Sequence, residues 1–355
     1  MNLLKFFVVC LLLNVSSVYA GDLENGDDAT LRKDYITALK KYKSAAEKND
    51  ATAQTNLGLM YVKGNGVSRD YVEAMRWFKL ASAQDDSSAE YFIGVMYSNG
   101  HGVVKNYTEA MQWYKLAAAK GHAKAQFSLG YMYVTGEGVK QDFAEARRWM
   151  KLAAEQGDDN AEYNFAVMYE NGNGVVKDKI EAVRWYGLAA EQGHVGAINW
   201  IKLAASDGNA DAQYRLGTIY YDGKALTKEY IEAIHWFTLA ARQGHAWSQV
   251  RLGLMYSNGT GVLQNYAESI KWFNSAAAQA HPFAIYKLSS MYFNGQGVPQ
   301  DYIKAHMWAN LAAIEGNLQA IKERDAIAAK MTPQQIAAAQ KMARECQVRK
   351  FKNCD

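Results

Sequence analysis

A tryptophan recurs at a fixed interval along most of this chain. The ladder consists of Trp77, Trp113, Trp149, Trp185, Trp200, Trp236, Trp272 and Trp308, and every interval is 36 residues except one of 15. A fixed period in this range is typical of stacked repeats, in which each unit buries its apolar face only against its neighbours. The sequence therefore predicts a solenoid, an architecture that exposes long surfaces and seldom builds the enclosed sites that catalysis needs.

One repeat contains two predicted helices separated by a glycine-rich loop. Residues 123–135 place apolar side chains at spacings of three and four, which define one helix face. The glycines in residues 136–138 end this helix, because glycine accepts positive φ. Residues 143–156 form the second helix, with Asp142 as its cap and Glu145 expected to complete a capping box. The ladder Trp lies on this second helix, where we expect it to pack in the core between units; a ligand platform is the alternative.

Polar residues at the helix starts are as regular as the ladder. The cap and its acidic neighbour recur as Asp70 with Glu73, Asn106 with Glu109, Asp178 with Glu181, and Asn265 with Glu268. Histidine is also periodic, since His122, His194, His245 and His281 share one position just after a helix ends. A shared repeat position indicates a structural role for these histidines rather than a catalytic one.

The chain departs from its own pattern at three places. The interval of 15 instead of 36 residues removes 21 residues and leaves room for only one helix, so the sequence predicts an interruption of the solenoid near residues 195–207. The loop at residues 223–225 reads Gly-Lys-Ala, and its backbone must be less extreme than in the Gly-x-Gly loops, or strained. In the N-terminal element, residues 34–46, Lys41 stands in place of the Trp, which is typical of a cap that faces solvent.

Three motifs recur in register over residues 34–315: G-x-G-V, then D-Y-x-E-A-x-x-W-Y/F-x-L-A-A-x-Q-G, then A-x-A-Q-x-x-L-G-x-M-Y. Together they resemble the Sel1-like repeat. The resemblance implies an all-α fold, an α/α solenoid of about seven 36-residue helix pairs related to the tetratricopeptide superhelix. It also implies a non-enzymatic adaptor of the bacterial envelope, or a secreted one, that binds a protein or peptide partner on its concave faces. A β-lactam-binding or weakly β-lactam-hydrolysing protein, like some cysteine-rich relatives, is the alternative, and a purely structural spacer is a third possibility.

The first twenty residues form a separate segment. Lys5 precedes an apolar run at residues 6–13, and small residues lead up to Ala20, so residues 1–20 are expected to be a cleaved signal peptide. An uncleaved anchor is the alternative, although the run is shorter than the ~20 apolar residues of a membrane span. No later stretch is long and apolar enough to cross a bilayer. The sequence predicts an exported protein, periplasmic or secreted, without an integral membrane segment.

The rest of the chain is expected to have four parts. These are an N-terminal repeat array with a capping helix at 21–194, a single helix at 195–207, a second array at 208–331, and a capping helix with a disulfide tail at 332–355. Removal of Lys5 lowers the 39 Lys and Arg residues to 38 against 36 Asp and Glu, a net charge of +2. Near balance argues against nucleic acid as a partner.

The tail carries the remaining cysteines, Cys346 and Cys354. Because an exported protein meets an oxidising environment, we expect a disulfide between them, with free thiols or metal ligands as alternatives. Thr332, Pro333 and Gln335 form a helix-start signal for a last helix at about 333–346. The chain lacks H-E-x-x-H, G-x-S-x-G, P-loop and S-x-x-K motifs, so we expect no catalytic residue, metal or cofactor.

The repeat pattern assigns a candidate binding surface. Alignment of L-G-x-M-Y with the L-G-x-x-Y of tetratricopeptide helices places the positions two and five residues before the Leu on the concave face. These positions hold Tyr91, Phe127, Tyr163, Tyr214, Trp247, Phe283 and Tyr286. Repeated aromatic side chains suit an extended or helical peptide; the alternative is that they pack within each unit. The interruption predicts two separate surfaces, the first three residues on one and the last four on the other.

Overall fold

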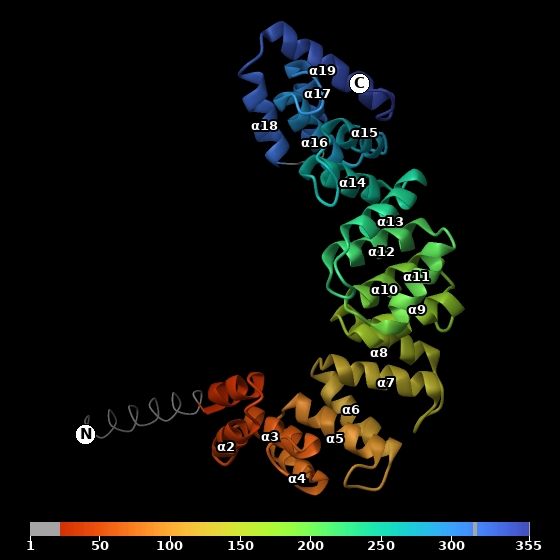
Figure 1. Cartoon of the computed structure of the whole chain (residues 1–355). Coiled ribbons are helices and arrows are strands. Elements are labelled where there is room, and N and C mark those ends of the chain that lie inside the picture. The colour runs from red at the N-terminus through yellow and green to blue at the C-terminus, as the bar shows by residue number, and fades with distance from the viewer. Residues whose placement is uncertain (1–21, 315–317, 355) are drawn as a thin grey trace, which may run out of the picture. The chain divides into compact units, whose positions relative to one another are not determined.

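The computed structural model describes residues 22–314 and 318–354, which contain helices and no strand (Figure 1). The predicted signal peptide, residues 1–20, lies outside the described residues. The described chain divides into two compact units, one ending at Asp178 and the other beginning at Lys179. The expected all-α solenoid of helix pairs is confirmed within each unit, because helices that follow one another along the chain pack side by side.

The first unit begins with a helix at residues 22–31. It continues with α2 (Tyr35–Ala46), α3 (Ala51–Lys63), α4 (Tyr71–Ser82), α5 (Ser87–Asn99), α6 (Tyr107–Ala119), α7 (Ala123–Thr135), α8 (Phe143–Glu155) and α9 (Asp159–Asn171). In this unit α3, α5, α7 and α9 are the first helices of repeats, and α4, α6 and α8 are second helices that carry the ladder Trp.

The second unit contains the single helix that the short interval predicts. Its helices are α10 (Lys179–Glu191), α11 (Val195–Ser206), α12 (Ala210–Asp222), α13 (Tyr230–Arg242), α14 (Ala246–Asn258), α15 (Tyr266–Ala277), α16 (Pro282–Asn294), α17 (Tyr302–Ile314), α18 (Leu318–Ala328) and α19 (Pro333–Val348). The single helix is α11, and α12 contacts both α10 and α11. The Trp200 ring of α11 stacks on Tyr186 of α10 at 4.1 Å between ring centroids. After α11 the first helices are therefore α12, α14 and α16.

Asp70, Asn106, Asp142 and Asn265 cap their second helices as predicted, but the capping box expected at Asp142 and Glu145 is not formed. The Asp142 carboxylate accepts hydrogen bonds from the backbone N–H groups of Ala144 at 2.8 Å and Glu145 at 3.1 Å. The Glu145 side chain does not return to the cap. It accepts a hydrogen bond of 3.1 Å from the Trp149 indole, and lies 3.5 Å from the Arg148 guanidinium. The acidic residue at this position thus orients the ladder Trp instead of completing the cap.

The centre of each repeat core is the residue that follows the ladder Trp. In five repeats this residue packs against the Gly of the L-G motif in the first helix, so that a Cβ on the Gly would approach its side chain to 2.6–2.8 Å. The pairs are Gly58 with Phe78, Gly94 with Tyr114, Gly130 with Met150, Gly217 with Phe237, and Gly253 with Phe273. In the last repeat both positions differ, as Ser289 and Ala309. In these five repeats, the large residue of the second helix thus packs where the first helix has no side chain.

This arrangement corrects the expected role of the tryptophans. Trp77, Trp185 and Trp308 are buried, but the other five members of the ladder are only half-buried. Each still packs between units; Trp149, for example, lies against the core cluster that α6 and α7 form. The ladder tryptophans thus cover the seam between repeats, and the core itself is built from the residue after each of them.

Buried glutamines join successive repeats, a feature that the sequence patterns did not predict. Gln126 donates from Nε2 to the Ala118 carbonyl at the end of the preceding helix, and its Oε1 accepts from Gln156 at 2.7 Å. The same arrangement recurs as Gln54 with Gln84, Gln213 with Gln243, and Gln249 with Gln279. At one junction of the first unit, Glu90 and Lys120 stand in place of the two glutamines. The Lys120 ammonium lies 2.8 Å from the Glu90 carboxylate. Each pair satisfies a buried polar group at a repeat junction.

The loop and both ends of the described chain also test the sequence predictions. Ala225 does not adopt the positive φ of Gly102 and Gly138, so the less extreme backbone is the correct alternative. Lys41 does not face open solvent: its Nζ lies 2.9 Å from Asp22 in the helix that precedes α2.

At the C-terminal end, α19 begins with the predicted capping box of Thr332 and Gln335. Ala339 and Ala343 of α19 join the core cluster to which α16 and α17 contribute, and α19 packs on α17. The structure joins Cys346 and Cys354 by a disulfide. The helix α18 has no counterpart in the sequence predictions.

Candidate functional site

The seven predicted binding residues all lie on first helices. We call the positions two residues before the motif Leu the inner row and those five residues before it the outer row. The inner row contains Tyr91, Phe127, Tyr163, Tyr214 and Tyr286, and the outer row contains Trp247 and Phe283. Tyr91, Phe127 and Tyr163 belong to the first unit, and the other four belong to the second.

Two inner-row tyrosines pack on the next repeat. The Tyr91 ring stacks on His122 at 4.8 Å between centroids, and the Tyr214 ring lies 4.7 Å from His245. Burial raises the pKa of Tyr91 to about 12, because the phenolate would lose its hydration. Thr55 has the equivalent position one repeat earlier and donates a hydrogen bond of 3.2 Å to Asp86. These rings therefore join neighbouring repeats, as the packing alternative expects for them.

Three of the four periodic histidines, His122, His194 and His245, cap the following helix through a side-chain hydrogen bond, whereas His281 makes none. Nδ1 of His122 accepts from the Ala125 N–H at 3.3 Å, and Nδ1 of His194 accepts from the Ala197 N–H at 3.1 Å. In other repeats the same position holds Asp50, Asp86, Asp158 or Asn209, each of which caps its helix with a side-chain oxygen. An accepting Nδ1 must be unprotonated, and burial lowers the pKa of His122 accordingly. The structural role predicted for this position agrees with these bonds.

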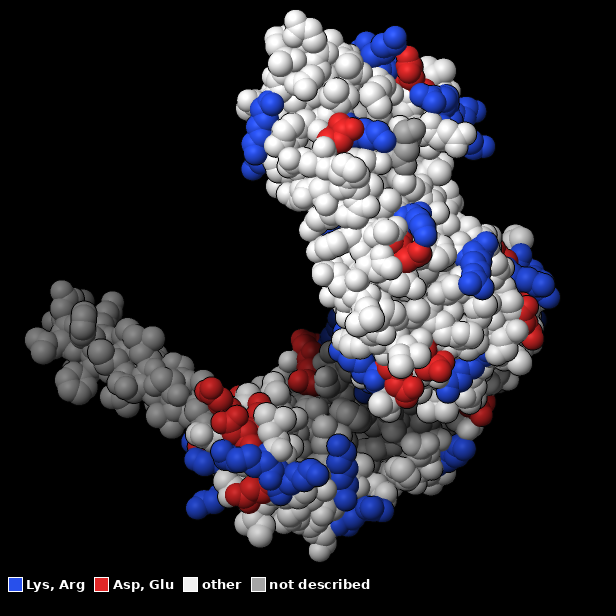
Figure 2. Space-filling model, turned by 45° about the horizontal axis from the view of Figure 1, so that its top comes forward, with Lys and Arg blue, Asp and Glu red and all other residues white. Residues whose placement is uncertain are grey.

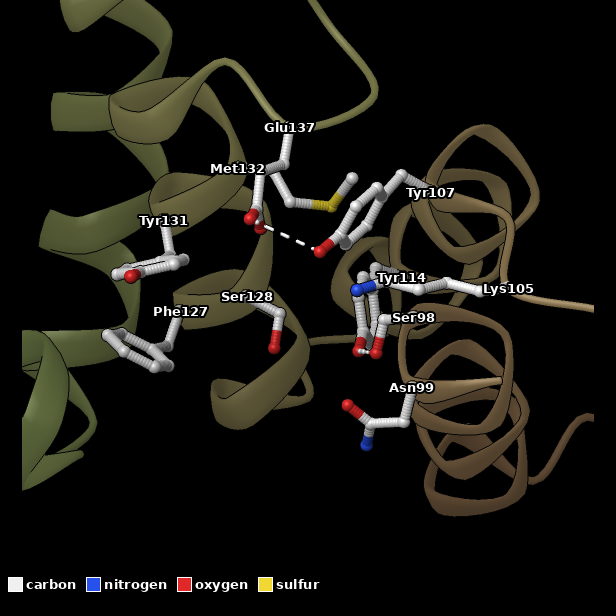
Figure 3. Close-up of a pocket in the computed structure, with 10 residues that line it drawn as sticks. All are labelled: Ser98, Asn99, Lys105, Tyr107, Tyr114, Phe127, Ser128, Tyr131, Met132 and Glu137. Carbon is white, nitrogen blue, oxygen red and sulfur yellow. Dashed lines mark hydrogen bonds between the residues drawn. The ribbon is translucent and has the colours of Figure 1, made fainter. Parts of the chain in front are cut away.

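Phe127 lines a pocket of about 220 Å³ in the first unit (Figure 3). Phe127 and Tyr131 lie next to each other on α7, across the pocket from Tyr107 and Lys105. The Tyr107 hydroxyl donates to Glu137 at 3.2 Å, and the Lys105 ammonium lies 4.6 Å from the Tyr107 ring centroid. Pockets that enclose drug-sized ligands usually measure ~300–1,000 Å³, so this volume suits a single side chain of a partner.

The pocket recurs two repeats earlier. Tyr35, Tyr42, Asn56, Met60 and Asn65 line a smaller cavity of about 90 Å³ at the positions that Tyr107, Tyr114, Ser128, Met132 and Glu137 have in the larger one. The same repeat positions thus line both cavities, and the side chains differ at Asn56 and Ser128 and at Asn65 and Glu137. Tyr163, the third predicted residue of the first unit, is half-buried on α9.

The exposed members of the predicted set lie in the second unit. Trp247 on α14 is 55% exposed, and Phe283 on α16 is 36% exposed. The Trp247 ring packs perpendicular to the ring of His281, the residue before α16, at 4.4 Å between centroids. The adjacent Tyr286 is half-buried, and burial raises its pKa. Trp247 and Phe283 therefore present large aromatic surfaces that the core of this unit does not use.

Sequence reasoning missed a set of basic residues beside these rings. Arg215, Arg251 and Lys287 directly follow the inner row at steps of 36 residues, where the first unit has Asn56, Phe92, Ser128 and Asn164. The Lys287 ammonium lies 5.4 Å from the Phe283 ring centroid, and the Arg251 guanidinium lies 5.4 Å from that of Tyr221. The 36-residue spacing was visible in the sequence, but it identifies the set only when the inner row is used as a reference.

The described residues contain neither a cluster of three or more His, Cys, Asp or Glu side chains that could hold a metal ion, nor a helix long and apolar enough to span a membrane. On the face drawn in Figure 2, basic and acidic side chains are interspersed rather than collected into one large patch of a single sign. Large areas of that face carry no charged side chain.

The repeats identify the family. The sequence model of the Sel1 repeat matches residues 19–50, 51–86, 87–122, 123–158, 159–194, 210–245, 248–281 and 282–317. The chain therefore belongs to the Sel1 repeat family, and its unmatched residues 195–209 include the single helix α11. Sel1 repeat proteins generally act as scaffolds for protein interactions.

Several solved structures are similar to this chain. A protective antigen of uropathogenic Escherichia coli with an SLR fold is 29% identical, over 94% of this chain and 84% of that one, with a TM-score of 0.46. A Sel1 repeat protein from Oxalobacter formigenes is also 29% identical, over 72% and 96% of the two chains, with a TM-score of 0.45. An immunity protein from Pseudomonas aeruginosa is 21% identical, over 59% and 74%, with a TM-score of 0.36. The comparison with curated proteins gives no match.

Proposed function

We propose that this protein is an exported bacterial scaffold that binds a protein or peptide partner, in the periplasm or outside the cell. The observation that carries the proposal is the exposure of Trp247 and Phe283 on the first helices of two successive repeats. Export is supported by the signal-peptide pattern of residues 1–20.

The two exposed rings are better explained by binding than by folding. Their equivalents in other repeats are small or polar, such as Ser88, Asn160 and Asp211, so the repeat does not need an aromatic side chain there. An exposed Trp or Phe offers a large rigid surface with little side-chain entropy to lose, and Trp in particular is enriched among residues that dominate binding energy. The binding surface of the second unit therefore centres on Trp247 and Phe283, with Tyr286 beside them.

A photoreactive amino acid at these positions tests the proposal directly. We would replace Trp247 or Phe283 by a benzophenone-bearing residue in the cells that make the protein, irradiate, and identify adducts of the purified protein by mass spectrometry. The matched control is the same residue at Leu263, an exposed apolar loop position of the same unit. The proposal expects one protein to be captured from both ring positions and not from Leu263. It is wrong if the three positions give the same background.

The first unit is a separate candidate surface. Phe127 lines the pocket of about 220 Å³. We propose that Phe127 and Tyr163 form a second surface that contacts the partner. Loss of affinity in a Phe127→Ala, Tyr163→Ala double variant that retains its helicity supports this surface. Unchanged affinity in the folded variant restricts binding to the second unit.

The β-lactam alternative is tested without knowledge of the partner. The cysteine-rich relatives carry disulfides within their repeats, whereas the cysteines of this chain beyond residue 20 both lie in the tail. Incubation of the purified protein with a chromogenic β-lactam should give no turnover. Turnover that a single side-chain substitution abolishes would replace the scaffold proposal by an enzymatic one.

A further inference from the structure

We infer that the exposed surface of α14 and α16 binds an acidic peptide segment, in which carboxylates meet Arg251 and Lys287 and apolar side chains cover Trp247 and Phe283. This inference rests on the proposed function and adds the chemistry of the partner.

Each of the two helices presents a ring and a cation on the same face. Trp247 and Arg251 are four residues apart on α14, and Phe283 and Lys287 are four residues apart on α16. Residues at this spacing are neighbours on a helix surface, and the Lys287 ammonium indeed lies over the Phe283 ring. The same pair of chemistries is thus repeated after 36 residues, on first helices of consecutive repeats.

Arg215 shows how the chain itself satisfies a cation at this position. Its guanidinium forms an ion pair of 2.7 Å with Glu191. Arg251 and Lys287, one and two repeats further on, form no ion pair with any carboxylate in residues 22–314 and 318–354. A carboxylate from a partner would give these two residues the interaction that Glu191 gives Arg215. Hydrogen bonds between charged groups are among the stronger ones, and a guanidinium can hold a carboxylate by two of them.

The neighbouring carboxylates are engaged elsewhere. Asp211, on the outer row of α12, lies 3.3 Å from Nε2 of His245, and this hydrogen bond lowers the pKa of Asp211. Glu323 accepts a hydrogen bond of 3.3 Å from Ser289, and burial raises its pKa. Lys287 acts on Glu323 electrostatically without forming an ion pair. Neither acid therefore forms an ion pair with Arg251 or Lys287.

A peptide fits these charges better than a nucleic acid does. Two cations bordered by Asp211 and Glu323 do not form the continuous basic groove that tracks a phosphate backbone. The overall charge is also near balance, +3 for the full chain. Single-stranded nucleic acid can still stack on Trp, so it serves as a competing probe in the experiment.

The experiment selects ligands from a random peptide library on the immobilised protein, residues 21–355. Three double variants are compared with it. The ring variant is Trp247→Ala with Phe283→Ala, and the charge variant is Arg251→Gln with Lys287→Gln. The matched control, Lys79→Gln with Lys115→Gln, removes the same charge from two exposed positions one repeat apart in the first unit. Circular dichroism establishes that each variant is folded before binding is measured.

The inference expects selected peptides that combine Asp or Glu with Trp, Phe or Leu. A selected peptide should bind at least about tenfold more weakly to the ring variant and to the charge variant, and its affinity for the control variant should be unchanged. Its affinity should also fall with added salt, since charge pairs at a surface are screened.

Three other outcomes are decisive. Peptides that lack acidic residues, and that lose affinity with the ring variant alone, overturn the acidic-peptide inference and leave the scaffold proposal intact. A selection in which no peptide depends on the rings contradicts both. Binding of a labelled oligothymidylate at the affinity of the best peptide, lost in the charge variant, assigns the surface to nucleic acid and also overturns the inference.

Discussion

Glu90 and Lys120 form an ion pair of 2.8 Å at the position where other repeats of this chain pair two glutamines. Lys120 also contacts Asp85 at 2.7 Å, and both carboxylates raise the pKa of Lys120. Glu90 is almost completely buried, whereas Lys120 remains about one-third exposed. The pairs that lie within one unit thus consist either of two neutral amides or of two opposite charges, and each gives the buried member a partner.

This equivalence predicts a compensating double substitution. Lys120→Gln alone leaves the buried Glu90 carboxylate without its cation and should lower the free energy of unfolding by roughly 1–3 kcal/mol. Glu90→Gln combined with Lys120→Gln restores the arrangement of Gln126 and Gln156 and should recover most of that loss. Denaturant midpoints of both variants check this. A double variant as unstable as the single one would show that the two positions are not coupled.

The packing of Phe273 on Gly253 predicts a size-dependent clash. A Cβ on Gly253 would lie 2.7 Å from the Phe273 ring, so Gly253→Ala should destabilise the protein by roughly 1–3 kcal/mol in spite of the better helix propensity of Ala. Gly253→Ala with Phe273→Leu should be more stable than the sum of the two single effects predicts. Thermal unfolding of the four proteins measures the coupling, and strictly additive effects would contradict the contact.

The buried cap His122 predicts loss of stability in acid. Its pKa in the folded protein lies below the ordinary value of 6.5, because burial disfavours the charged ring and the Lys124 charge adds to this effect, while Asp86 and Asp158 oppose it. As the pH falls, the unfolded chain is therefore protonated at His122 before the folded protein is. The contribution of neutral His122 to stability is complete above pH ~6.5 and is lost as the pH falls through the lowered pKa.

An Asn at position 122 separates capping from titration. Asn209 caps α12 from the equivalent position with a hydrogen bond of 2.9 Å, so His122→Asn should keep the cap while it loses the stacking of Tyr91. Its stability should therefore be somewhat lower at pH 8 but should fall less between pH 7 and pH 5 than that of the parent protein. Unfolding midpoints across this range provide the measurement. Parallel pH profiles of the two proteins would exclude His122 as a source of the acid sensitivity.

The disulfide between Cys346 and Cys354 predicts a local effect. Intact mass should rise by two hydrogens on reduction, and an unchanged mass after full reduction would mean that the bond is not formed in solution. The bond closes a short loop, which on the loop-entropy model contributes roughly 2–3 kcal/mol. Reduction should therefore loosen the tail while the repeats stay helical, since each repeat contacts only its neighbours.

Much of the fold was visible in the sequence because the repeat is strongly periodic. Asp142 and Gly136 delimit helices through local backbone chemistry, and the 15-residue interval leaves space for one helix, α11. The core centre was misassigned for a physical reason. The residue after the Trp has to fill the space beside a glycine of the first helix, and side chains of different types can do so. Phe78, Tyr114 and Met150 therefore have the same packing role although the sequence shows no common residue type at this position.

The candidate site was less predictable because exposure depends on residues a repeat away. Tyr91 packs on His122, which is 31 positions further along the chain, and only the structure shows that contact. Trp247 and Tyr91 were equivalent candidates in the sequence, yet their rings differ in exposure. The unpaired state of Arg251 could not be predicted either, since it depends on where every carboxylate of the unit lies.

The affinity of the photo-captured partner for Trp247→Ala, Phe283→Ala protein tests the central claim most directly. Both rings are exposed, so the free energy of unfolding of the variant should stay within ~1 kcal/mol of that of the parent. Titration calorimetry should show binding weakened by at least about tenfold, or ~1.4 kcal/mol. A folded double variant that binds its partner as tightly as the parent protein would show that these rings are not the binding surface.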